Sequence, residues 1–167
     1  MDDILIQRLD TATSGLAATR ARVEARVPWS LAAVFDESDE ARWGPPEVLA
    51  HVEEMASFWL GEMERIIDGD GRRPVPFGRT ASDRLRIGLI ERDRVLPPRE
   101  LYDRIAATYE RVARRIPTLT ATDLAKIGTH VRWGDMDVPA IIDRFLVTHL
   151  EEHVRQLESI LGDGSGP

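Results

Sequence analysis

A stripe of apolar residues with helical spacing opens the chain and constrains its fold more than any other feature. Within residues 3–25, the inward positions follow one another at alternating intervals of four and three residues. They are Leu5, Leu9, Ala12, Leu16, Thr19 and Val23. Such a stripe covers one face of an α-helix and must be buried against other elements. The segment therefore predicts one helix of a bundle, and Pro28 ends it.

Helical periodicity continues through most of the chain. Long helices are predicted over residues 3–25, 44–68, 99–116 and 139–161. A minor, arginine-rich helix is predicted over 80–95, after a proline-containing connection at 72–77. Residues 127–138 are a candidate hairpin with Gly134-Asp135 as its turn. We therefore expect an all-α four-helix bundle with a minor extra helix and a short hairpin.

Length and composition limit the possible classes of protein. A chain of 167 residues suits one domain, expected over residues 1–161, followed by a flexible tail at 162–167. The net charge is −7 and no dense basic patch occurs, which argues against a nucleic-acid partner. The N-terminus does not resemble a signal peptide, and no apolar run is long enough to cross a bilayer. We expect a cytoplasmic protein without a membrane partner.

Three of the four histidines lie on inward stripes of the predicted helices. His51 is in the second turn of the second helix, among apolar residues. His149 and His153 are one turn apart on the fourth helix, so their imidazole rings can converge on one ion. Because the chain has no cysteine, any metal would be held by nitrogen and oxygen ligands. The three histidines are candidate ligands of a divalent metal; the alternative is that they are hydrogen-bonded core residues.

Two polar residues lie near the histidine pair on the fourth helix. Gln156 is about 40° from the direction midway between His149 and His153, and Glu152 is about 80° from it. Gln156 is a candidate hydrogen-bond partner of an imidazole or of a metal-bound water, with a helix-packing amide as the alternative. Glu152 is a candidate orienting group or base. We assign both residues to the candidate catalytic set. Glu54, three residues after His51, is interpreted as a surface ion-pair partner, with a hydrogen bond to the site as the alternative.

The segment from His149 to His153 also fits the inverted zinc-protease pattern H-x-x-E-H, with Glu152 as the base. Only 14 residues follow His153, too few for the downstream helix that would supply a third, acidic ligand. A protease of that class is therefore not expected.

Other polar and aromatic residues have structural interpretations as their first choice. His130, in the hairpin, is interpreted as a surface or loop-packing residue, with a pocket residue as the alternative. The arginines of the minor helix are interpreted as solvated charges, the alternative being sites for an anionic thiol or a substrate carboxylate. They are Arg84, Arg86, Arg92 and Arg94. The four tryptophans are interpreted as packing residues, one or two of which line a pocket mouth.

Two short segments resemble the signature segments of a known family. They are Trp43 followed by Pro46-Glu47-Val48-Leu49-Ala50-His51, and the run from His149 to Gln156. Both are similar to those of the DinB/YfiT-like superfamily, and the helix order is similar too. Members are four-helix bundles with an up-down-down-up connection, and many hold zinc or nickel on one histidine of helix two and two of helix four. The resemblance implies that His51, His149 and His153 are these ligands.

The same resemblance implies a range of activities. Relatives include transferases and isomerases that use low-molecular-weight thiols such as mycothiol or bacillithiol, and others described as metal-dependent hydrolases. Three imidazoles leave a coordination position open, where a metal can lower the pKa of a bound water or thiol. We expect a hydrolase or thiol S-transferase with a small-molecule substrate, as a homodimer. The alternative is a non-catalytic small-ligand-binding or dimeric scaffold protein with a structural or vestigial metal site.

Overall fold

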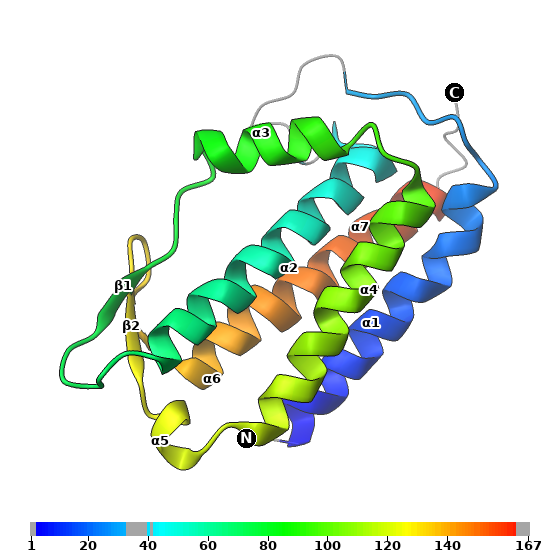
Figure 1. The fold of residues 1–167 in the computed structure, drawn as a ribbon. Helices are drawn as coiled ribbons and strands as arrows, with labels where there is room; N and C mark the ends of the chain where they lie inside the picture. The colour runs from blue at the N-terminus through cyan, green and yellow to red at the C-terminus, as the bar shows by residue number, and fades with distance from the viewer. Residues whose placement is uncertain (1–2, 33–39, 41, 163–167) are drawn as a thin grey trace.

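Four long helices that lie side by side make up most of the computed structural model, which describes residues 3–32, 40 and 42–162 (Figure 1). They are α1 (Asp3–Glu24), α2 (Pro45–Ile67), α4 (Pro98–Arg115) and α7 (His149–Gly162). Helices α1 and α2 each pack against both α4 and α7. Every position of the apolar stripe predicted for α1 is buried. The predicted long helices are thus confirmed, whereas residues 163–167 of the predicted tail lie outside the described part of the chain.

The start of α2 is held by a buried carboxylate. Glu47, in the first turn, is fully buried and accepts hydrogen bonds from the backbone amides of Ala32, at 2.9 Å, and Gly44, at 3.2 Å. Arg94 forms an ion pair with the same carboxylate at 3.1 Å. The interpretation of Arg94 as a solvated charge is therefore wrong, because it neutralises a buried acid. This anchor lies one turn before His51 and fixes the beginning of the helix that carries it.

The fourth predicted helix contains a π-helical stretch directly before His149. Helix α6 (Val138–Ile141) leads into η3 (Ile142–Thr148), whose turns are π-helical, and α7 follows without a break. Inside this stretch, the hydroxyl of Tyr109 on α4 donates a hydrogen bond to the carbonyl of Leu146 at 3.1 Å. A π-helical turn is wider than an α-helical one and changes the register of the residues before it relative to those after it. The α-helical spacing that places His149 and His153 on one face therefore applies within α7 only.

A small three-stranded sheet packs at one end of the bundle (Figure 1). Strand β1 (Val75–Phe77) pairs in parallel with β2 (Ile127–His130), which pairs antiparallel with β3 (Gly134–Asp137). The predicted hairpin is confirmed, but its predicted turn is wrong. The chain reverses at residues 131–133, and Gly134 follows with a φ of 72°, as expected after a three-residue turn. Strand β1 was expected only as a connection, so the expectation of a purely helical chain apart from one hairpin is corrected.

The minor helix is shorter than predicted. Helix α3 (Arg84–Asp93) begins where the Asp83 carboxylate accepts a hydrogen bond from the amide of Arg86 at 2.9 Å. It packs on α2. Two further short elements are η2 (Ile116–Thr118) and α5 (Ala121–Leu124).

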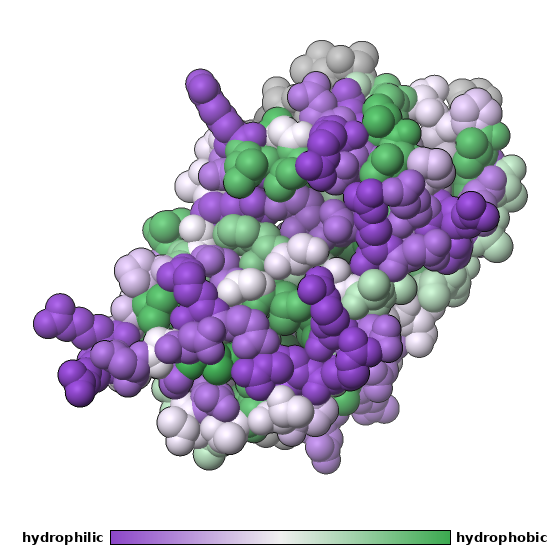
Figure 2. All heavy atoms as spheres, viewed as in Figure 1, coloured by the Kyte–Doolittle hydropathy of each residue, from purple (hydrophilic) through white to green (hydrophobic). Residues whose placement is uncertain are grey.

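The outer surface gives no sign of a membrane-crossing helix. In Figure 2, hydrophilic residues cover most of the face seen in Figure 1, with smaller apolar areas between them. Among the residues that the structure describes, no helix combines the length and apolar character needed to cross a bilayer.

Candidate metal centre

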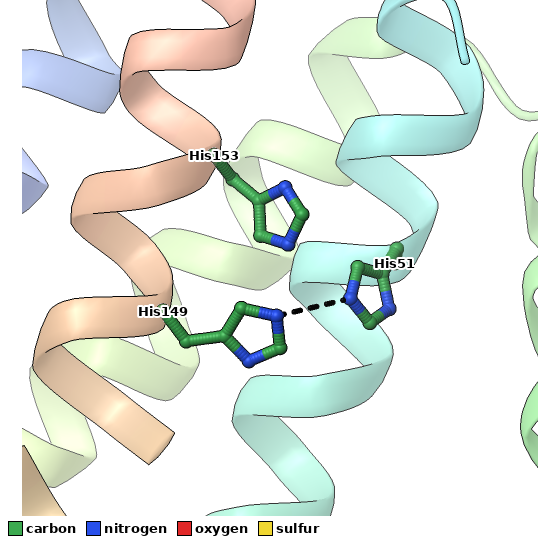
Figure 3. A group of neighbouring side chains, drawn as sticks. All are labelled: His51, His149 and His153. Atoms are coloured by element: carbon green, nitrogen blue, oxygen red, sulfur yellow. Dashed lines mark hydrogen bonds between the residues drawn. The ribbon is translucent and has the colours of Figure 1, made fainter. Parts of the chain in front are cut away.

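Helices α2 and α7 bring the three candidate histidines together. His51 points from α2 toward His149 and His153 of α7 (Figure 3). Their potential ligand atoms all lie within 4.8 Å of one another, and the Nε2 atoms of His51 and His149 are 3.4 Å apart. Two nitrogens bound to one tetrahedral ion at about 2.05 Å would be separated by roughly 3.3 Å. The pair formed by His51 and His149 therefore already has the spacing that a shared ion requires.

Burial keeps the three imidazoles neutral. His51 and His153 are 2% and 6% exposed, and His149 is half-buried. Burial, with smaller contributions from His153 and Arg86, lowers the pKa of His149 to about 3. Burial also lowers the pKa values of His51 and His153. A neutral imidazole has one nitrogen with a free lone pair, so all three rings can act as ligands at neutral pH.

The hydrogen bonds of His153 leave one nitrogen available for an ion. The amide nitrogen of Gln156 donates to the backbone carbonyl of Glu40 at 2.7 Å, which fixes the orientation of the amide group. Its oxygen therefore faces Nδ1 of His153, 2.9 Å away, and accepts the Nδ1–H proton. The lone pair is then on Nε2, a buried atom without a hydrogen-bond partner in the described residues. A metal ion would satisfy this atom, so the residues fit such a group.

The other side of the site is aromatic. The ring of Trp43 stands edge-on to His51, with 5.5 Å between ring centroids and 74° between planes. Trp43 is 2% exposed, so it closes this side to solvent. The second nitrogen of His51, Nδ1, is buried and has no hydrogen-bond partner in the described part of the chain. No described side chain thus fixes the ring of His51 in the way that Gln156 fixes that of His153.

The two acidic candidates differ in burial and in their partners. Glu152 is exposed and lines the same cavity as His51 and His149, and its role as a base stays a prediction. Glu54 forms the predicted ion pair, with Arg79, but it is buried and not on the surface. Its second oxygen has no hydrogen-bond partner in the described residues.

A cavity of about 620 Å³ opens beside the triad. His51 and His149 line it, together with an aromatic wall. In this wall Trp59 stacks on Phe145 with 4.1 Å between centroids, and Phe145 stacks on His130 at 5.1 Å. The volume is in the range of small-molecule sites. His130 is buried, so its interpretation as a surface residue is wrong. It packs within the hairpin, as the loop-packing interpretation had it, and it also lines the cavity, which was the alternative.

Several arginines also line the cavity, and sequence reasoning missed most of them. They are Arg79, Arg86, Arg132 and Arg144. Arg86 is 5% exposed and paired with Glu40, which contradicts its interpretation as a solvated charge. These side chains come from four separate parts of the chain, so no local sequence pattern could group them. The sequence offered a signal for Arg86, as one of the arginines of the minor helix for which an anion site was the alternative interpretation.

Comparison with family models agrees with this geometry. Residues 15–157 match the model of the DinB superfamily, a range that begins in α1, ends in α7 and includes all three histidines. The chain belongs to the DinB superfamily. The resemblance stated from the two short segments is thereby confirmed for nearly the whole length of this DinB superfamily chain. No curated protein and no solved structure was found to match it.

Proposed function

We propose that this DinB superfamily protein is a metal-dependent enzyme, in which His51, His149 and His153 hold a zinc or nickel ion. The observation that carries the proposal is the unpartnered Nε2 of His153, which is buried beside two further neutral imidazoles. Imidazole nitrogen is a suitable ligand for both metals. No fourth His, Asp or Glu joins the group in the described residues, as expected for a catalytic site with an open position.

The proposed reaction takes place in the cavity beside the triad. When bound, the ion would lower the pKa of a water molecule or a low-molecular-weight thiol, which supports either hydrolysis or thiol S-transfer. Glu152 lines the cavity with an exposed carboxylate and is the proposed acceptor of the proton released. Gln156 holds the ring of His153 through Nδ1–H. The substrate is a small molecule, because the cavity is of that size.

The domain boundaries and the order of the long helices are also part of the proposal. We propose one domain over residues 1–161, with the long helices in up-down-down-up order. The connection between α2 and α4 supports this order, because it spans residues 68–97 and contains β1 and α3. Such a length allows the chain to return to the starting end of α2 before α4 begins.

Cobalt substitution tests whether the proposed site is open. Protein loaded with Co²⁺ is expected to show visible absorption bands, and these should shift when 2-mercaptoethanol is added, because a thiol takes the open position. The absorption spectrum measures both effects. Bands that stay unchanged at a saturating thiol concentration would contradict an open site and favour a structural ion.

A second prediction concerns Gln156. The Gln156→Leu variant is expected to bind metal about 10–100-fold more weakly, because the ring of His153 loses the partner that fixes its tautomer. Competition with a chromogenic chelator measures the affinity. The control is Gln7→Leu, the same substitution at an exposed position of α1, which should leave the affinity unchanged. Equal affinities in both variants would show that the hydrogen bond does not orient the ligand.

A further inference from the structure

Two arginines from different elements line the cavity near the turn between β2 and β3. Arg132 of the turn and Arg144 of η3 both lie over the ring of Trp133, with guanidinium carbons 4.9 Å and 3.6 Å from its centroid. Both arginines are exposed, and neither forms an ion pair or hydrogen bond through its guanidinium within the described residues. Stacking on Trp133 holds the two charges side by side without neutralising them.

His130 holds the turn that carries Arg132, one member of this arginine pair of Arg132 and Arg144. Its Nδ1 accepts hydrogen bonds from the backbone amides of Arg132, at 3.0 Å, and Trp133, at 3.3 Å. The proton of the neutral ring is therefore on Nε2. His130 is 5% exposed, and Nε2 has no partner in the part of the chain that the structure describes. Burial, with smaller contributions from Arg144 and Arg132, lowers the pKa of His130, so the ring stays neutral and its Nδ1 keeps accepting from the two turn amides.

The acidic residues along the cavity leave this end positive. Glu40 is paired with Arg86, and Asp143 is paired with Arg8 at 2.7 Å. The carboxylate of Glu152 borders the cavity on the same helix as two of the metal-site histidines. The charges of Arg132 and Arg144 therefore have no carboxylate partner in the described residues.

The cavity extends along α2 from the triad to this positive end. His51, Met55 and Trp59 follow one another at intervals of four residues and all line the cavity. Eight residues of helix correspond to roughly 12 Å. Trp59 then contacts His130, with 5.9 Å between ring centroids. An elongated ligand can therefore reach from the triad over an apolar floor to the arginine pair.

We propose that the substrate carries an oxyanion, a carboxylate or a phosphate, bound by the arginine pair roughly 12 Å from the reacting atom at the triad. This inference rests on the proposed function and names its substrate class. Planar guanidinium groups match the oxygens of such a group. Its apolar body lies on Trp59 and Phe145. Arg132 and Arg144 are thus specificity residues of the site.

Linear mercaptoalkanoic acids and their amides test this proposal. The series runs from mercaptoacetate to mercaptoundecanoate, and each acid is compared with its neutral amide on metal-loaded protein by titration calorimetry. The short acids are expected to show no preference over the amides. Acids near the length of mercaptodecanoate should bind about tenfold more tightly than their amides, because only these reach the arginine pair.

Matched variants identify the source of the preference. In the double variant Arg132→Gln/Arg144→Gln, the preference for the acid is expected to disappear, while the affinity for the amide stays unchanged. The control Arg84→Gln removes an exposed charge of α3 away from the cavity and should keep the preference. Phosphonate analogues of the same lengths are compared with the same amides. A preference over the amide that is larger for the phosphonate than for the carboxylic acid indicates phosphate as the natural group, and the reverse indicates carboxylate.

Two outcomes would overturn the proposal. One is equal affinity of acid and amide at every length; the other is a loss of preference in Arg84→Gln as large as in the double variant. The proposed function is tested separately, because the Co²⁺ spectrum reports the thiol on the ion and not the oxyanion. If the amides shift the Co²⁺ spectrum but the acids bind no more tightly than the amides, the oxyanion site is refuted. The open metal site is then still supported.

Discussion

The His149→Ala variant is expected to lose most of its bound metal while keeping its helices. Removal of one of three imidazole ligands leaves only His51 and His153, and two ligands hold a divalent ion far more weakly than three. We expect the affinity to fall at least about a hundredfold. The fold should persist, because the apolar core of the bundle extends over all four long helices. Metal analysis and far-ultraviolet circular dichroism measure the two effects.

The fourth histidine provides the control for this experiment. His130 lies outside the group of candidate ligands, so His130→Ala should retain the metal. Added zinc should raise the melting temperature of the wild type and of His130→Ala, but not that of His149→Ala, since only a bound ligand stabilises the native state. A His149→Ala protein that loses its helical signal would point to a structural ion. One that keeps its metal would remove His149 from the site.

The Gly78→Ala variant is expected to be destabilised by about 2–4 kcal/mol in the free energy of unfolding. Gly78 has a φ of 85°, a conformation that residues with a side chain rarely adopt. An added Cβ would lie 2.3 Å from Cδ2 and 2.5 Å from Nε2 of His130. The ring cannot retreat easily, because Phe145 and Phe77 pack against it. Urea unfolding measures the change.

Gly61→Ala is the matched control for this substitution. Gly61 lies inside α2, is exposed, and has open space where a Cβ would be added. Alanine favours the helix there, so the free energy of unfolding should rise by up to about 1 kcal/mol. Equal effects of the two substitutions would contradict the close packing of Gly78 against His130.

The sequence predicted those parts of the fold that depend on local periodicity. The α1 stripe is buried as expected because all its positions lie on one helical face. The approach of His149 to His153 follows from one helical turn, and the addition of His51 depended on the family resemblance as well. Parts that depend on distant pairing were not predicted. Strand β1 has three residues, one of them Pro76, and it forms only by pairing with β2, about fifty residues later.

The cavity wall was unpredictable for a similar reason. Arg144 reaches Trp133 from a different element, and the π-helical turns of η3 set its direction in a way that no regular period describes. His130 has an unremarkable local sequence, and its role follows only from the two backbone amides that fix its proton on Nε2. The candidate ligands were therefore accessible from sequence, whereas the groups proposed to contact a substrate required the tertiary structure.

Elemental analysis of protein purified without an affinity tag, together with the His51→Ala variant, tests the central claim most directly. We expect near one equivalent of zinc or nickel in the wild type and little in the variant, since His51 is the only ligand that α2 contributes. Metal-free wild-type protein, even after incubation with either ion, would contradict the metalloenzyme account. So would an equal metal content in both proteins.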